Sequence, residues 1–155
     1  MTPHGIVARA TFADAHELAA KLRPEDRREV EEITGKPALH NLLLAVAIGE
    51  PALTLRDHER GLIGIMGVAR TGLHSGAVSF LGTSLIEQRS SAFLRGSREV
   101  LREVSKEYDT LFNVCDARNL VHQKWLKWLG FRFIRKIDRF GASGVPVIEF
   151  ARITT

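Results

Sequence analysis

Cysteine, aromatic residues and long apolar runs are all scarce in this sequence. Its 155 residues include one cysteine, Cys115, and only 7% of them are aromatic. A single cysteine excludes an internal disulfide, and no cationic leader precedes an apolar run, so we expect synthesis in a reducing, intracellular compartment without a signal peptide. The most apolar stretch, residues 39–48, is well short of the roughly 20 apolar residues that span a bilayer. We therefore expect a soluble protein with no membrane partner.

The sequence also has only a small excess of charge of one sign. The 22 basic and 18 acidic residues give a formal net charge of +4, an excess too small to indicate specific binding to nucleic acid. Arg95, Arg98 and Arg102 recur along one predicted helix, but Glu99 and Glu103 alternate with them at ion-pair spacing. We expect these side chains to form a salt-bridged solvent face rather than a stripe that follows phosphates.

Internal repeats, low-complexity tracts and flexible linkers are absent, so we expect residues 1–155 to form a single domain. Within it, apolar periodicity, capping residues and turn residues predict the order β α α α β β β α β α β β. The predicted helices begin near Thr11, Pro24, Pro37, Ser90 or Ser91, and Asn119, and the predicted strands cover residues 6–10, 52–56, 62–69, 77–81, 111–115, 131–138 and 145–153.

The order of the elements indicates the fold class. Strands that are joined by short turns pair antiparallel, whereas the helix between the strands at residues 77–81 and 111–115 requires a parallel crossover. We therefore predict an α/β fold with a mixed, largely antiparallel sheet of about seven strands and helices on both faces. The helix at residues 37–48 should be buried on several sides, because most of its residues are apolar.

Two stretches of the sequence carry a resemblance to a known family. Residues 113–119 read Asn-Val-Cys-Asp-Ala-Arg-Asn, and residues 125–131 read Trp-Leu-Lys-Trp-Leu-Gly-Phe. Together with the order of the elements, they resemble strand five and helix four of the GCN5-related N-acetyltransferase (GNAT) fold. The resemblance implies a V-shaped gap between strands four and five, in which members of this fold bind acetyl-CoA.

A narrower resemblance is to small acetyltransferase-like proteins of tailed bacteriophages, some of which are named internal virion protein A. It rests on short runs at residues 7–11, 13–15, 22–26, 67–68 and 81–83, and on the Trp-Leu-Lys-Trp-Leu-Gly-Phe end of the last helix. This likeness covers roughly residues 7–133. It implies a phage source, a location in the host cytoplasm or in the virion, and other virion proteins as partners.

The GNAT resemblance also implies where acetyl-CoA would bind. The family holds the pyrophosphate on backbone N–H groups at the start of the helix after strand four, through a loop patterned Gln/Arg-x-x-Gly-x-Gly/Ala. The matching stretch begins with Arg89, which fits, but Ala92 and Leu94 fill both glycine positions. Ser90 and Ser91 either contact the pyrophosphate or cap the helix.

Two more residues are implied at the cofactor by the same resemblance. Thr83, which follows strand four, would lie near the pantetheine. Asn119 matches a family Asn at the edge of the cofactor, and it is equally suited to cap the helix that follows it. We expect no metal site, because the six histidines show no spacing that places two ligands on one face.

The catalytic residues of the family are poorly matched. The Tyr that often protonates the leaving thiolate, four residues before the Gly of the Gly-Phe pair, is replaced by Leu126, which has no proton to give. Glu87 is the nearest candidate for a general base, and its other interpretation is a solvated surface acid. These departures favour an acetyltransferase-like phage protein with weak or lost catalysis. The alternative is an active acetyl-CoA-dependent N-acetyltransferase that acts on an amine of a protein or small molecule.

Three further residues that attract attention are better explained by packing. Cys115 ends an apolar strand and has no basic cluster beside it in the sequence, so we expect an inert thiol. Trp125 and Trp128 lie on the apolar stripe of their helix, which predicts contact with the sheet.

Overall fold

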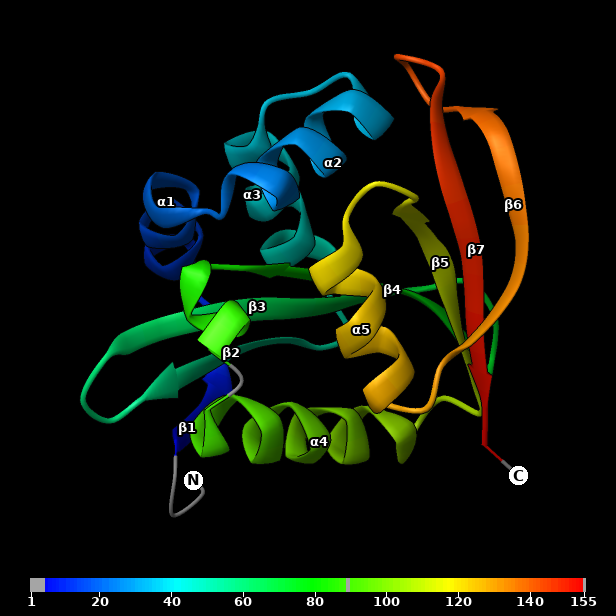
Figure 1. Cartoon of the computed structure of the whole chain (residues 1–155). Helices are drawn as coiled ribbons and strands as arrows, with labels where there is room; N and C mark the ends of the chain where they lie inside the picture. Colours follow the sequence, from blue (N-terminus) through cyan, green and yellow to red (C-terminus); the bar gives the residue numbers. More distant parts are fainter. Residues whose placement is uncertain (1–4, 89, 155) are drawn as a thin grey trace.

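A computed structural model describes residues 5–88 and 90–154, and it shows an α/β fold with one seven-stranded sheet and helices on both faces (Figure 1). The strands lie in the order β1-β2-β3-β4-β5-β7-β6. The elements are β1 (Gly5–Arg9), α1 (Phe12–Lys21), α2 (Pro24–Thr34), α3 (Ala38–Ile48), β2 (Ala52–Asp57), β3 (Gly61–Arg70), β4 (Ser75–Gly82), the 3-10 helix η1 (Ser84–Gln88), α4 (Ser91–Ser105), β5 (Thr110–Asp116), α5 (Leu120–Trp128), β6 (Arg132–Phe140) and β7 (Val145–Ile153). The predicted fold class is confirmed.

Local signals explain where the first helices begin and end. Thr11 caps α1 in a capping box, in which the Asp14 N–H donates to Thr11 Oγ1 at 3.2 Å and the Thr11 N–H donates to Asp14 Oδ2 at 2.8 Å. Pro24 is the first residue of α2, and Gly35 ends this helix with φ 72°, a left-handed conformation that favours glycine. These boundaries are those that the sequence predicts.

The sheet separates two apolar cores. One core lies between the sheet and helices α4 and α5 and includes Phe93, Val100 and Tyr108. The other lies beneath α1 and α3 and includes Leu18 and Leu42. Each core is built from the apolar stripe of its helices and the alternate side chains of the strands, which is why both faces of the sheet are covered (Figure 1).

The prediction that α3 is buried on several sides is wrong. Only Ala38 and Leu42 of this helix are buried, whereas Leu44 and Ile48 are 48% and 51% exposed. Apolar composition alone does not set how much of a helix is buried, because burial depends on what packs against each face. This helix contacts α1, α2 and β3. Its side chains Leu44, Ala45 and Ile48 border a cavity that is described below.

Strands β4 and β5 form the parallel pair that the sequence predicts. Their pairing is short, because only residues 75–77 of β4 match residues 110–112 of β5, although β4 continues to Gly82 and β5 to Asp116. Beyond the third pair the two strands are no longer joined by ladder hydrogen bonds. The expected V-shaped gap between strands four and five is therefore present in the fold.

Helix α4 has the predicted amphipathic character, but its basic face does not form the predicted ion pairs. Among the described residues, the ion pair found on this helix joins Glu103 to Lys106, at 2.9 Å, and none involves Arg95, Arg98 or Arg102. The Arg98 guanidinium instead lies 3.8 Å from the centre of the Trp128 ring. An aromatic ring attracts the guanidinium and also covers the apolar stem of the arginine side chain. The ring therefore competes with an exposed carboxylate for the arginine.

Helix α5 begins after Asn119 and is followed by Gly130, whose φ is 92°. Trp125 is buried in the larger core, and Trp128 packs against that core from its edge, as predicted. Cys115 is fully buried, and burial raises the pKa of its thiol to about 12, so its expected inertness has a physical cause. No helix among residues 5–88 and 90–154 is long and apolar enough to span a membrane.

Candidate functional site

One side chain bridges the gap between β4 and β5 where their ladder ends. The Asn113 Nδ2 donates to the Val78 carbonyl of β4 at 2.8 Å, and the Val114 N–H donates to Asn113 Oδ1 at 2.8 Å. The side-chain amide offers a donor and an acceptor, as a backbone peptide would. Asn113 therefore takes the place of a peptide in the narrow part of the gap.

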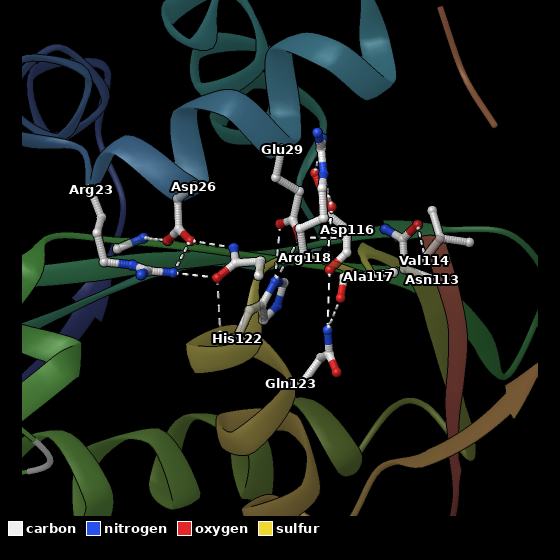
Figure 2. A network of polar contacts seen from close by, with 12 residues as sticks. Arg23, Asp26, Glu29, Asn113, Val114, Asp116, Ala117, Arg118, His122 and Gln123 are labelled. Carbon is white, nitrogen blue, oxygen red and sulfur yellow. Dashed lines mark hydrogen bonds and ion pairs between the residues drawn. The ribbon is translucent and has the colours of Figure 1, made fainter. Parts of the chain in front are cut away.

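Two carboxylates of α2, Asp26 and Glu29, reach the strand ends at the wide end of the gap (Figure 2). The Gly82 N–H at the end of β4 donates to Asp26 Oδ2 at 2.9 Å, and the Asp116 N–H at the end of β5 donates to Glu29 Oε1 at 2.7 Å. Both carboxylates are buried, with 2% and 5% exposure. The spacing of three residues places both on one face of the helix, above the two strand ends.

Arg23 and Asn119 hold the first carboxylate in place. Arg23 Nη2 and Asn119 Nδ2 each donate to Asp26 Oδ1 at 2.9 Å, and Arg23 also donates to the Asn119 side-chain oxygen. The Arg23 backbone N–H donates to the Gly82 carbonyl at 2.9 Å, so the end of β4 is bonded through both its donor and its acceptor. Arg23 is 2% exposed, which makes this a buried ion pair, and its Nε is buried without a hydrogen-bond partner among the described residues.

His122 holds the second carboxylate. Its Nδ1 lies 3.0 Å from Glu29 Oε2, and both side chains are buried. Burial lowers the pKa of the imidazole, but the charge and hydrogen bond of Glu29 outweigh burial, so the pKa of His122 is raised. Within the described part of the chain, His122 Nε2 is buried without a hydrogen-bond partner.

The strand end at Asp116 carries a further charge pair. Arg118 Nε donates to Asp116 Oδ1 at 2.9 Å, and the same guanidinium contacts Glu32 of α2. Burial raises the pKa of Asp116, and the hydrogen bonds from Arg118 outweigh it, so the pKa of this carboxyl is lowered. We use the name gap network for Arg23, Asp26, Glu29, Asn113, Asp116, Arg118, Asn119 and His122.

A cavity of about 370 Å³ extends from α3 to the gap between β4 and β5, and Glu29, Asn113 and His122 of the gap network line it. Its walls come from α2, α3, and strands β3, β4 and β5, and most of its lining side chains are apolar. Glu29 and His122 are its ionisable lining residues. In the described residues, no cluster of three or more His, Cys, Asp or Glu side chains is arranged to hold a metal.

The residues that the GNAT resemblance places at a cofactor are bonded within the protein. The Thr83 hydroxyl donates to the Leu62 carbonyl at 2.9 Å, and Ser90 caps α4 by accepting from the Phe93 N–H at 3.2 Å. Ser91 is the first residue of α4 and is exposed. Arg89 lies outside the described residues. Asn119 caps α5 by accepting from the His122 N–H at 3.4 Å, and it belongs to the gap network as well.

The two candidate catalytic positions differ in their surroundings. Glu87 lies in η1, where its half-exposed carboxylate is 3.2 Å from Arg23 Nη1, so it is an outer partner of the gap network. Leu126 is fully buried in the larger core. The position of the family Tyr is thus occupied by a leucine whose side chain packs in the core.

Several backbone groups that border the gap have partners within the chain. The backbone groups of Gly82, the Asp116 N–H, the Val78 carbonyl and the Val114 N–H all have partners within the chain. At the first turn of α4, a buried Ala92 stands at one of the two glycine positions of the phosphate loop. Acetyl-CoA would have to compete with these partners for the groups named.

Sequence reasoning missed Asp26, Glu29 and His122 as parts of a site. Apart from Arg23, which lies three residues before Asp26, their partners here are 56 to 93 residues away in the chain, so no local motif joins them. One signal was available. Asp26 and Glu29 share a helix face with Val30 and Ile33 at spacings of three, four and seven residues, which places two acids on an apolar stripe.

Comparison with solved structures agrees with the fold, whereas the sequence comparisons give no match. No protein-family model and no curated protein match the sequence. An acetyltransferase of the GNAT family from Bacillus anthracis is similar with a TM-score of 0.72 and 10% identity, over 99% of this chain and 96% of that one. A ribosomal-protein-S5-alanine acetyltransferase from Vibrio fischeri gives 0.69 and 18%, over 99% and 95%.

A third similar structure contains the cofactor. The RimL ribosomal L7/L12 alpha-N-protein acetyltransferase, solved in complex with coenzyme A, gives a TM-score of 0.74 at 8% identity, over 99% of this chain and 96% of that chain. These likenesses cover nearly the whole chain at low identity. The chain therefore has the fold of GNAT acyl-CoA N-acetyltransferases.

Proposed function

We propose that this GNAT-fold protein has weak or lost acyl transfer and acts as a binding or assembly module. One observation carries the proposal. The Gly82 N–H and the Asp116 N–H, at the two strand ends that flank the gap, donate to Asp26 and Glu29 of the same chain. Side chains of α2 thus bond both strand ends of the gap that defines the fold, which supports a gap closed to a cofactor.

Displacing these two hydrogen bonds would cost a cofactor a measurable part of its binding free energy. A cofactor that entered the gap would have to break these two hydrogen bonds to ionised acceptors, each worth about 1.5–3 kcal/mol. The sum corresponds to a loss of roughly 10²- to 10⁴-fold in affinity. If the cofactor also separated Asp26 from Arg23, the buried guanidinium would keep only its more exposed partners, Glu25 and Glu87.

The chemistry of transfer is weakened independently. Leu126 offers no proton to a leaving thiolate, and a missing general acid costs about 10²- to 10⁴-fold in rate. Glu87 is tied to Arg23, so its carboxylate is partly engaged as an ion-pair partner. Both observations support a protein that keeps the scaffold without the usual catalytic groups.

The proposal extends to a phage source and to other virion proteins as partners. Its support is the sequence likeness to small phage proteins over roughly residues 7–133. The protein would then reside in the host cytoplasm or in the particle. Mass spectrometry of purified virions tests this part, since the protein should co-purify with the particles in stoichiometric amounts, and its absence from them would contradict a virion role.

Isothermal titration calorimetry with acetyl-CoA tests the closed gap. We expect no saturable heat up to about 1 mM acetyl-CoA, a concentration that corresponds to about −4 kcal/mol of binding. The matched variant is Ser90→Ala with Ser91→Ala, which removes the hydroxyls that the family resemblance places at a pyrophosphate. Micromolar binding by the unmodified protein that weakens in this variant would overturn the proposal and favour an active N-acetyltransferase.

A further inference from the structure

Exposed cations gather on the face of the molecule that carries α4 and α5. These two helices share the larger core, and β6 is the edge strand of the sheet beside them (Figure 1). We use the name basic surface for six exposed cations of these elements: Arg95, Arg98 and Arg102 of α4, Lys124 and Lys127 of α5, and Lys136 of β6. Among the described residues, none of the six forms an ion pair. Their charge is therefore open to a partner from solution.

Two contacts between cations and aromatic rings join the three elements into one surface. The Arg98 guanidinium of α4 lies 3.8 Å from the centre of the Trp128 ring of α5. One residue earlier in α5, Lys127 Nζ lies 5.2 Å from the centre of the Phe133 ring of β6. The cations of α4 and α5 and the start of β6 therefore lie side by side.

Lys124 and Lys136 lie on the same side of the molecule as Lys127. Lys124 precedes Lys127 by three residues, which places both on the exposed side of α5. Lys136 is paired with Ile148 of β7, which packs against the larger core. Directly paired residues share a face of the sheet, so Lys136 lies on the α5 side, about 10 Å along β6 from the ring that Lys127 contacts.

The acidic residues of α4 lie on the other side of its exposed face. At about 100° per residue, the three arginines fall within about 60° of arc, and Arg98 is at the end that contacts α5. Glu99 and Glu103 lie about 100° and 140° from Arg98, and Glu103 is paired with a lysine of its own helix. Asp138 is exposed two residues beyond the lysine of β6. Six cations thus outnumber these three carboxylates, and the surface is positive.

The composition of the basic surface favours nucleic acid over an acidic protein. Protein interfaces have an apolar centre from which lysine is depleted, whereas protein–DNA interfaces are polar and strongly positive. Half of the six cations are lysines. Trp128 and Phe133 pack against the larger core, and each has a cation over its ring, so neither offers the open face on which a single strand would stack its bases. The partner that fits is the phosphate backbone of a duplex.

We propose that the basic surface binds the phosphate backbone of duplex nucleic acid without reading its sequence. Guanidinium and ammonium groups donate to phosphate oxygens and release condensed counterions. Arg95 and Arg102 are about 10 Å apart along α4, and the phosphates of one strand follow one another at about 3.4 Å along the duplex axis, so several phosphates are within reach together. The basic surface excludes the strand ends that Asp26 and Glu29 bond, so duplex binding and acetyl-CoA binding are measured, and can fail, separately.

Fluorescence anisotropy with two unrelated DNA duplexes of about 20 base pairs tests the proposal. At about 50 mM salt we expect micromolar affinity that agrees within about twofold for the two sequences. Six phosphate contacts give a slope of about −5 in log K against log salt, so affinity should fall about 10³-fold between about 50 and 200 mM salt. No binding at about 50 mM salt with about 100 μM protein, or a preference of more than about tenfold for one sequence, would overturn the proposal.

Two competitors test the choice of partner. A single strand of equal length should compete less well than unlabelled duplex, because the surface has no open ring for stacking and a single strand carries less charge per length. Poly-L-glutamate at equal charge should also compete less well. If the single strand binds more tightly than the duplex, or if poly-L-glutamate competes as well as the duplex, the assignment to a duplex backbone is wrong.

A matched pair of double variants locates the site. Lys124→Gln with Lys136→Gln removes two cations of the basic surface, so the salt slope should fall in magnitude by about 2 and the affinity at about 50 mM salt by at least about tenfold. Lys21→Gln with Lys36→Gln makes the same change in net charge at two exposed lysines, one in α1 and one just before α3, and should leave the slope within about 0.5. Melting temperatures check that both variants fold. If the folded control weakens binding as much as the first variant, net charge rather than the basic surface binds the duplex and the proposal is wrong.

Discussion

Buried charge is the dominant feature of this protein at the scale of single residues. Arg23, Asp26, Glu29 and His122 are each at most 5% exposed, and each has a partner of opposite charge. Such pairs gain little net stability over apolar residues of the same volume, because desolvation offsets their attraction. Their value lies in geometry, since the donors at the ends of β4 and β5 would otherwise be buried without partners.

The first prediction concerns the carboxylate that Gly82, Arg23 and Asn119 share. Asp26→Ala should lower the free energy of unfolding by about 3 kcal/mol or more, because it leaves a buried guanidinium short of a partner. Glu25→Ala is the matched control, since Glu25 contacts the same guanidinium at 3.0 Å with a 43% exposed side chain and should cost at most about 1 kcal/mol. Urea unfolding measures both, and equal losses would contradict the account.

The second prediction concerns pH. Because Glu29 raises the pKa of His122 above that of an exposed imidazole, the folded protein binds this proton more tightly than the unfolded chain does. The resulting stability is fully present below about pH 6.5 and is lost as pH rises through the folded-state pKa. Glu29, Asp26 and Arg23 are the charged groups that face the ring.

Urea unfolding between about pH 6 and pH 7.5 measures this dependence, below most of the ionisation of the Cys115 thiol in the unfolded chain, whose ordinary pKa is about 8.5. The unmodified protein should lose stability across this range. The His122→Phe variant should show a flatter profile, whatever its absolute stability. A profile with the same slope in both proteins would show that another group titrates.

Sequence alone predicts single residues only where their role is local. Thr11, Ser90 and Asn119 cap helices, as their positions before the helices predict, and Cys115 is buried because its strand is apolar. The same reasoning could not place Asp26, because an acid in the first turn of a helix is favourable without any tertiary partner. Its contacts with Gly82 and Asn119 depend on the tertiary fold.

At the scale of elements, helix α2 is the helix whose side chains contact both strand ends of the gap. Its two carboxylates reach strand ends that the ladder of β4 and β5 leaves unpaired. A helix presents residues three apart on one face, so a single rigid element can serve both strands. Any movement of α2 away from the sheet would break both contacts together.

The third prediction concerns how closely α4 packs against β2. A Cβ at Gly96 would lie 2.4 Å from Leu55 Cδ1, whose side chain is itself buried. Gly96→Ala should therefore destabilise the protein by about 1 kcal/mol, because overpacking of about 1–3 kcal/mol exceeds the gain in helix propensity of about 1 kcal/mol.

Arg95→Ala is the neighbouring control for this helix. Arg95 is exposed, so this change should alter the free energy of unfolding by no more than about 0.5 kcal/mol. Thermal or urea unfolding of both variants measures the difference. A Gly96→Ala variant that is more stable than the unmodified protein would show that α4 has room to move from β2.

Element order, type and approximate bounds follow from the sequence, because each long element carries its own periodic pattern and caps. Two element-level expectations failed for the same physical reason. The burial of α3 and the ion pairs of α4 depend on what lies opposite each face, a cavity in one case and the Trp128 ring in the other. The short 3-10 helix η1 also escaped prediction, since five residues carry too little periodicity.

At the scale of the whole molecule, the fold is shared with GNAT structures at TM-scores of 0.69 to 0.74, although identity is between 8% and 18% in the three comparisons described. The pattern of helices and strands is therefore kept while the groups in the gap differ from the family loop. Fold alone does not determine activity, since function depends on the site. In this chain, the bonds from both strand ends to Asp26 and Glu29 support the proposed closure of the gap.

The backbone amides of Gly82 and Asp116 report most directly on that closure. In ¹H–¹⁵N NMR spectra, both amides should be protected from hydrogen exchange without ligand, because Asp26 and Glu29 accept their hydrogen bonds. Addition of acetyl-CoA to about 1 mM should leave both signals in place, as expected for binding weaker than about −4 kcal/mol. Rapid exchange of both amides, or shifts that saturate at micromolar acetyl-CoA, would contradict the account.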